Sequence, residues 1–174
     1  ILALASEQAL AKADIICLKG SCLTEGWSGQ NDNGYWFELR CVEKDCANKG
    51  WKIRDSQGHS VVSECLGAGC FKDGFKESNV YNPREFAMSL CQSKDANTQP
   101  DCLKYGWEST SGPRSSVTQC RNENCQTNGW VIKVSGQADM IAFCKNQKCF
   151  ENGWIIRIGC NKSIGIELIS IGIK

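Results

Sequence analysis

The sequence predicts an all-β protein, a tandem array of six β-hairpin repeats of about 24 residues stapled by disulfides. Cysteine is abundant, with 13 residues in a chain of 174, whereas only 16 of the 113 positions from Cys17 to Gly129 are Ile, Leu, Val or Phe. A Gly-aromatic pair also recurs with a period of 24 residues. Because the net charge is only +1, this composition favours a crosslinked fold with a thin core over disorder.

The repeat unit reads C-x4-C-x3-G-W, and one copy departs from it by a longer cysteine interval. Successive Gly-aromatic pairs are separated by 24, 24, 32, 23 and 24 residues. A fixed period of this size is typical of architectures with one supersecondary unit in each repeat. The six pairs are Gly26-Trp27, Gly50-Trp51, Gly74-Phe75, Gly106-Trp107, Gly129-Trp130 and Gly153-Trp154.

Each repeat is expected to form one hairpin. In the second copy, 52–55 and 60–64 have strand composition, and the turn-prone residues 56–59 lie between them. The glycine before the aromatic suits a positive φ where the chain reverses. The aromatic then begins a strand and shares one face with every second residue, which a single hairpin cannot bury. Stacked hairpins at about 4.8 Å per strand would form an elongated ladder roughly 60 Å long.

A closed fold is the alternative. Six hairpins also match the strand count of a β-trefoil, and an insertion at 79–101, between repeats 3 and 4, divides the array into two halves. Within the insertion, Arg84–Leu90 follows Pro83 and has a helix-like composition. We rank the ladder first, because a β-trefoil-like domain needs more large aliphatic residues at its centre.

The predicted boundaries place the Cys-rich array at 17–160. Residues 1–16 are read as a leader remnant or a short N-terminal helix, since Ala11-Lys12-Ala13 has the form of a signal-peptidase site. Residues 161–174 alternate between apolar and small or polar residues and predict a tail strand. The chain has no run of about 18 apolar residues, so no membrane span is expected.

The cysteines allow two pairing schemes of six bridges each. Either the two cysteines of each motif pair, which leaves Cys160 over, or the second pairs with the first of the next unit, which leaves Cys17 over. We favour the first scheme, because it completes every motif. Cys160 is then unpaired or intermolecular. The disulfide candidates are Cys17, Cys22, Cys41, Cys46, Cys65, Cys70, Cys91, Cys102, Cys120, Cys125, Cys144 and Cys149.

Binding residues are sought among the aromatics. Repetition in every unit favours packing for the motif tryptophans, while flat exposed rings would instead bind sugars or peptides. Trp36 lies outside the motif, and strand alternation should place it on the face opposite Tyr35, Phe37 and Leu39. Trp36, with Tyr35 beside it, is therefore the first candidate for an exposed contact. The other candidates are Trp27, Trp51, Trp107, Trp130 and Trp154.

The repeat also resembles the choline-binding repeats of bacterial surface proteins, which pair Gly-Trp with a hairpin of about this size. Those repeats lack the cysteine pair and carry additional aromatics for the ligand. Only the first copy, with Tyr35 and Trp36, has comparable residues, so the resemblance transfers no binding residue.

No catalytic, metal or cofactor motif is recognised, and the single histidine, His59, lies in a predicted turn. The near-neutral charge gives no reason to expect nucleic acid. We therefore expect a non-enzymatic module for protein or glycan partners that is secreted, at the cell surface or periplasmic. Self-association through Cys160 and the tail strand is also predicted. The alternative is an intracellular interaction protein whose repeats bind zinc through thiolates.

Overall fold

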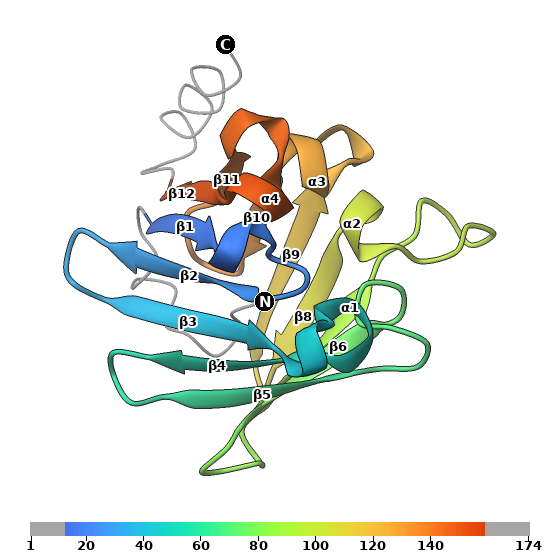
Figure 1. Cartoon of the computed structure of the whole chain (residues 1–174). Helices are drawn as coiled ribbons and strands as arrows, with labels where there is room; N and C mark the ends of the chain where they lie inside the picture. Colours follow the sequence, from blue (N-terminus) through green and yellow to red (C-terminus); the bar gives the residue numbers. More distant parts are fainter. Residues whose placement is uncertain (1–12, 159–174) are drawn as a thin grey trace.

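The strand ladder closes on itself. The computed structural model describes residues 13–158, which form twelve antiparallel strands in one barrel (Figure 1). Each strand pairs with its neighbours in chain order, and the last pairs with the first. The strands are β1 (Ala13–Cys17), β2 (Gly26–Asn31), β3 (Trp36–Cys41), β4 (Trp51–Asp55), β5 (Ser60–Cys65), β6 (Gly74–Asn79), β7 (Phe86–Cys91), β8 (Trp107–Ser111), β9 (Arg114–Cys120), β10 (Trp130–Val134), β11 (Met140–Cys144) and β12 (Trp154–Ile158).

Closure shows that the predicted open ladder is wrong. The alternative prediction, a closed β-trefoil-like domain, is confirmed only in that the sheet closes. The strands follow one another around the barrel in up-and-down order. Strand twist accumulates along a ladder, and closure leaves no unpaired strand edge. The roughly 60 Å predicted for the length of the ladder is therefore closer to the circumference of the barrel.

The sixth hairpin is assembled from both ends of the described chain. The first five hairpins are continuous, whereas β12 takes its return strand from β1, with Ala13 opposite Ile156 and Ile15 opposite Trp154. Figure 1 shows β1 in blue beside β12 in orange-red. Residues 13–16, which we expected in a leader or helix, are therefore part of a strand. Residues 1–12 lie outside the described part, as do Cys160 and the predicted tail strand.

The barrel has two chemically different ends. Each return strand stops at the first cysteine of a motif, and each outgoing strand starts at or just after the motif glycine, so all motif turns lie at one end. We call this the cysteine end and the opposite one the tip end. Four motif turns include a short helix (Figure 1): α1 (Cys46–Lys49), α2 (Cys102–Tyr105), α3 (Cys125–Asn128) and α4 (Cys149–Asn152).

The six disulfides confirm pairing within each motif. The Cα atoms of the paired cysteines are 4.3 to 4.6 Å apart, because the residues between them turn tightly before the second cysteine. Each bridge thus ties the end of a return strand to the following turn. The pairs are Cys17–Cys22, Cys41–Cys46, Cys65–Cys70, Cys91–Cys102, Cys120–Cys125 and Cys144–Cys149.

The motif glycines have the predicted positive φ and a second constraint. At Gly129 φ is +74°, and an added Cβ would lie 1.9 Å from the carbonyl oxygen of Ala142 on the return strand. The same contact occurs in the split hairpin, where a Cβ on Gly153 would lie 2.1 Å from the Ile15 oxygen. Glycine is therefore required both by the turn and by the neighbouring backbone.

The motif aromatics fill the barrel. Barrels of about eight strands are filled by ordinary side chains, so a twelve-stranded barrel needs larger groups at its centre. All six rings are 0 to 6% exposed. Ring contacts, with centroids 4.9 to 6.4 Å apart, join them in the order Trp27, Trp154, Trp130, Trp107, Phe75, Trp51.

The insertion is organised differently from the prediction. Arg84–Leu90 is not helical, because 86–91 form the return strand β7 between β6 and β8. Pairing with two neighbouring strands outweighs the local helical preference. The additional residues form a longer tip at 80–85 and a longer loop between Cys91 and Cys102.

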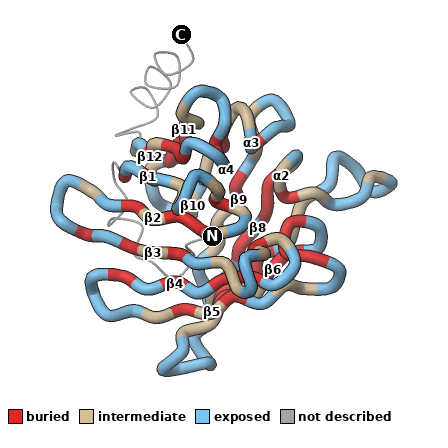
Figure 2. Tube along the Cα trace, viewed as in Figure 1, coloured by how far each residue is buried: buried red, intermediate tan, exposed pale blue. Residues whose placement is uncertain are grey.

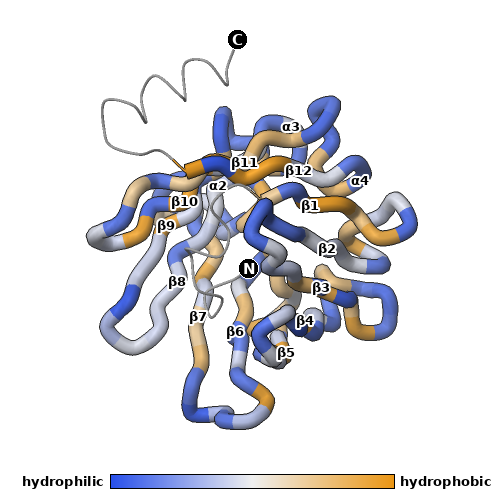
Figure 3. Tube along the Cα trace, turned by 90° about the vertical axis from the view of Figure 1, so that its left-hand side faces the viewer, coloured by the Kyte–Doolittle hydropathy of each residue, from blue (hydrophilic) through white to orange (hydrophobic). Residues whose placement is uncertain are grey.

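The interior is divided into a polar and an apolar half. Figure 2 marks buried positions along the strands, and Figure 3 shows hydrophobic colours along β11, β12 and β1 but paler or blue colours along β6 and β8. In the polar half, Trp51 Nε1 donates to Glu77 Oε2 at 3.2 Å, and the hydroxyls of Ser89 and Ser109 are 2.6 Å apart. The buried polar residues are Asp55, Ser63, Glu77, Ser89, Ser109 and Thr118.

Candidate functional site

Trp36 is an exposed aromatic on the outer face of β3. Its side chain is 41% exposed, whereas Tyr35, Phe37 and Leu39 are 7, 1 and 0% exposed, which confirms the predicted alternation. The backbone is fixed to the next hairpin, since Ser56 N donates to Trp36 O at 2.9 Å and Trp36 N donates to Ser56 Oγ at 3.2 Å. The indole therefore projects from a well-anchored position at the tip end.

A shallow groove of about 340 Å³ lies beside this ring, across the outer faces of β1, β2 and β3. In the strand register, Gln30 lies between Asp14 and Trp36, and Ser28 lies between Ile16 and Glu38. The small side chain of Ser28 keeps the floor low between the larger side chains. The lining residues are Asp14, Ile16, Ser28, Gly29, Gln30, Trp36, Phe37 and Glu38.

Two arginines hold the Trp36 side of the groove in place. The Arg54 guanidinium lies 5.9 Å from the centre of the Trp36 ring, within the range of a cation-π contact. Glu38 Oε1 accepts a hydrogen bond from Arg40 Nε at 2.7 Å and another from Arg54 Nη2 at 3.2 Å. Arg54 lies on β4, on the side away from β2. The ring is thus braced from that side, while its other side borders the groove.

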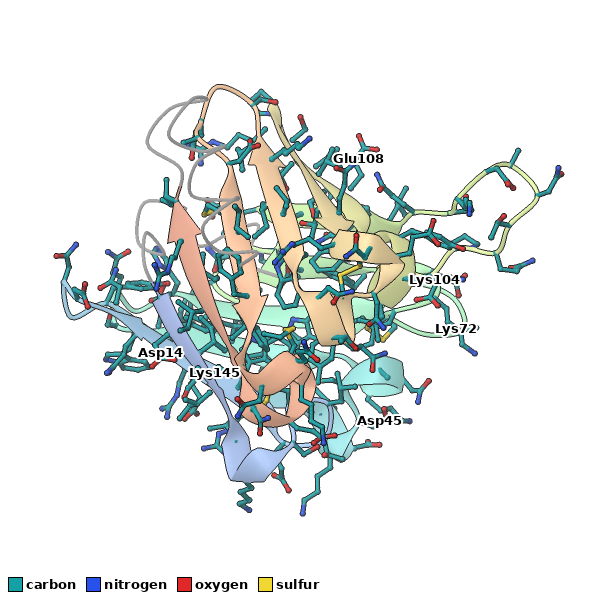
Figure 4. The ribbon with its side chains drawn as sticks, turned by 90° about the horizontal axis from the view of Figure 1, so that it is seen from above. Asp14, Asp45, Lys72, Lys104, Glu108 and Lys145 are labelled. Carbon is teal, nitrogen blue, oxygen red and sulfur yellow. A yellow bond between two sulfur atoms is a disulfide. The ribbon has the colours of Figure 1, made fainter. Side chains whose placement is uncertain are left out.

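Both carboxylates of the groove are already neutralised. The hydrogen bond from Arg40 is the main cause that lowers the pKa of Glu38, which keeps this carboxylate ionised and paired. At the other end, Lys145 Nζ pairs with Asp14 and also donates to the carbonyl of Ile15 at 3.2 Å. Figure 4 shows Asp14 and Lys145 close together. A ligand would therefore meet a groove without strong net charge.

The other aromatics named from the sequence lie elsewhere. The five motif tryptophans are inside the barrel, with at most 6% of their surface exposed, so packing accounts for their position. A binding role for these five rings stays a prediction. The structure does not bring them together with Trp36 on one surface.

Tyr35 also points inward and takes part in a hydrogen-bond network that the sequence analysis missed. Its hydroxyl donates to Asp55 Oδ2 at 3.0 Å, and the same oxygen is 2.8 Å from His59 Nδ1. Asp55 Oδ1 accepts from the backbone N–H groups of Gln57 and His59, each at 2.9 Å. Burial, with the hydrogen bond to Asp55, raises the pKa of Tyr35. The Asp55-x-x-Gly58-His59 turn was the available signal, but its link to Tyr35 depends on cross-strand register.

For Asp55, burial acts to raise the pKa, but the hydrogen bonds from His59, Tyr35 and Gln57 outweigh it and lower the pKa. The network therefore stabilises an ionised carboxylate at the tip end. It ties together the two ends of the turn between β4 and β5, whose Ser56 anchors Trp36, and so contributes to the rigidity of that region.

A second hollow, of about 480 Å³, lies between the turn at 68–73 and the loop before α2. Lys72 and Lys104 flank it (Figure 4). Its carboxylates serve local turns: Asp73 accepts from Ala68 N, and Asp101 caps α2 by accepting from Leu103 N at 2.9 Å. Tyr105 lines this hollow beside Lys104, but it is only partly exposed, whereas Trp36 is exposed.

Within residues 13–158, no three His, Cys, Asp or Glu side chains gather as a metal site. The twelve repeat cysteines are paired as disulfides, so the thiolates that the zinc alternative requires are not free. In the same range, no helix has the length and apolar character to cross a bilayer.

Comparison with protein-family models, curated proteins and solved structures finds no match for this chain. Function is therefore inferred from the geometry of the groove.

Proposed function

We propose that this protein is an exported, non-enzymatic binding module whose partner site is the outer groove of β1, β2 and β3. The observation behind this proposal is Trp36, which is 41% exposed although it is braced by Arg54 and Ser56 next to a groove. Tryptophan and arginine are enriched among the residues that dominate binding energy.

Preorganisation supports a binding role. Trp36 and Glu38 are held in place by cross-strand hydrogen bonds and ion pairs before any partner arrives. A surface that is already ordered loses less conformational entropy when a partner binds. A closed barrel with six disulfides is a rigid support for such a surface.

The compartment follows from the sulfur chemistry. Six intrachain disulfides indicate an oxidising environment. Export to the cell exterior, the cell surface or a periplasm is the proposed route to such an environment.

The chemistry of the groove supports binding without catalysis. Glu38 is held ionised between Arg40 and Arg54, which makes it a poor general acid. Asp14 is paired with Lys145. Both groups are suited to shaping a surface, and we assign them that role.

The test is a binding screen of the oxidised protein on arrays of glycans and of extracellular proteins. Trp36→Ala should weaken the specific signals by about tenfold, the loss of one aromatic contact. Phe86→Ala is the matched control, because Phe86 also begins a return strand, is also 41% exposed, and has Lys76 over its ring. Specific binding that is as strong in Trp36→Ala as in the parent, or turnover of a bound partner, would contradict the proposal.

A further inference from the structure

We propose that the groove beside Trp36 binds an uncharged sugar, a neutral pyranoside whose apolar face stacks on the indole ring. This inference rests on the proposed function and specifies the partner of the same site. It follows from three properties of the groove: its charge, its walls and its polar edge.

Charge is the first property. A sulfated or sialylated sugar needs a cation in the groove, but neither Arg40 nor Arg54 is among the lining residues, and both donate hydrogen bonds to Glu38. A cationic ligand needs a free carboxylate, but Asp14 is paired with Lys145 and Glu38 with the two arginines. A ligand inside the groove therefore meets carboxylates that are already paired, and an uncharged ligand leaves those pairs intact.

The walls are the second property. Trp36 is 41% and Ile16 52% exposed, and they lie on β3 and β1 with only β2 between them. Strands two apart are separated by about 10 Å, and the register also offsets Trp36 and Ile16 by two residues along the strands. The space between the two side chains therefore runs diagonally over Gln30 and Ser28, with room for one six-membered ring. The axial hydrogens of a pyranose form an apolar face that can pack against these two side chains. The low floor at Ser28 lets that ring approach the sheet.

The polar edge is the third property. Gln30 and Ser28 line the groove between the two apolar walls. An amide and a hydroxyl each offer a donor and an acceptor, which is the pattern needed to bind sugar hydroxyls. The oxygens of Asp14 and Glu38 at the margins add acceptors. The groove thus has apolar side chains beside uncharged polar ones, as a pyranose has an apolar face beside its hydroxyls.

The arrangement of the tryptophans provides a direct readout. Trp36 is exposed, and the five motif tryptophans are buried in the barrel. The indole N–H resonance of Trp36 in a ¹H–¹⁵N spectrum, assigned by its loss in Trp36→Phe, should therefore shift on titration with a ligand of the groove. The five buried indole resonances serve as an internal control for the fold.

The experiment titrates the oxidised protein with methyl glycosides of glucose, galactose, mannose and N-acetylglucosamine. Parallel titrations use a sulfated disaccharide, sialyllactose and a short tryptophan-containing peptide. We expect at least one neutral glycoside to shift the Trp36 resonance. Trp36→Ala should weaken its binding by about tenfold, the loss expected for one aromatic stacking contact. Phe86→Ala should leave it unchanged, and Gln30→Ala should weaken it by a smaller factor.

The outcomes separate this inference from the proposed function. If only the charged sugars or the peptide shift Trp36, the groove is a binding site but its ligand is not a neutral sugar. If neutral sugars shift resonances away from the groove and still bind Trp36→Ala, both the site and the inference are wrong. If no ligand moves the Trp36 resonance, the neutral-sugar inference is overturned, and the array screen decides the proposed function.

Discussion

The two ends of the barrel differ in how closely the six repeats resemble one another. At the cysteine end, the six repeats present the same components: a disulfide, a glycine against a backbone carbonyl and a buried aromatic. At the tip end, each hairpin has its own loop. Trp36 and the protruding 80–85 loop each belong to one hairpin, and the Tyr35–Asp55–His59 network joins one pair of hairpins. Repeated residues thus build the scaffold, and unrepeated residues supply the candidate site.

The largest expected effect is at the cysteine end. Reduction of the disulfides should unfold the barrel, because each short bridge contributes about 2 kcal/mol and the whole stability of a domain is about 5 to 15 kcal/mol. Circular dichroism melts with and without reductant check this. EDTA is the control and should leave the melting temperature unchanged; unfolding by EDTA alone would indicate a metal in place of the bridges.

Removing one motif aromatic should have the next largest effect. Trp130→Ala is expected to destabilise the protein by about 4 kcal/mol, since Trp130 is 6% exposed and packs against Trp107, Phe150 and Trp154. Chemical denaturation gives the free energy of unfolding. A loss below about 1 kcal/mol would mean that the motif aromatics do not form the core of the scaffold.

Two glycines of the fifth hairpin separate conformational strain from steric contact. Gly129 and Gly136 both have a φ of +74°, but an added Cβ meets the Ala142 oxygen at 1.9 Å at Gly129 and nothing within 4 Å at Gly136. Gly129→Ala should destabilise by about 3 kcal/mol and Gly136→Ala by about 1 kcal/mol. Equal losses in denaturant titrations would show that only φ matters.

The tip-end network should contribute less. Tyr35→Phe removes the hydrogen bond to Asp55 and should cost about 1 kcal/mol. Tyr81→Phe, at a side chain that is 78% exposed, is the matched control and should have no effect. If both substitutions behave alike, the buried hydroxyl does not stabilise the tip.

The same network gives a pH dependence. The pKa of Asp55 is lowered in the folded protein, so its stabilising effect is present above the unfolded pKa of about 3.9 and is lost as the pH falls through the folded value. Asp55→Asn should therefore be less stable than the parent at neutral pH, and the difference should shrink in acid. Melting temperatures from pH 7 downward test this, and a constant difference would contradict it.

The smallest expected effect on stability is at the candidate site. Trp36→Ala should change the free energy of unfolding by no more than about 0.5 kcal/mol, because the ring lies on the outer surface. The contrast with Trp130→Ala, measured by the same denaturation, sharpens the division between site and scaffold. A large loss at Trp36 would move it to the scaffold.

Sequence reasoning succeeded where structure depends on local spacing. The preference for completing every motif predicted the bridge between Cys120 and Cys125, and alternation from Tyr35 predicted the exposure of Trp36. Closure depends instead on twist summed over twelve strands, which no single repeat encodes.

The groove was missed because its β1 wall, with Asp14 and Ile16, comes from residues 1–16, which were expected to form a leader remnant or a short N-terminal helix. Pairing of β1 with β2 places that segment on the sheet and completes the site.

Closure also fixes the number of repeats. An open solenoid can gain or lose a unit by duplication or deletion, because each unit contacts only its neighbours. Here, loss of one 24-residue unit would leave ten strands, reduce the circumference by about a sixth and crowd the remaining rings, whereas one extra unit would open a hole at the axis. Variation among such barrels should therefore appear in the length and chemistry of individual tips, with the copy number held at six.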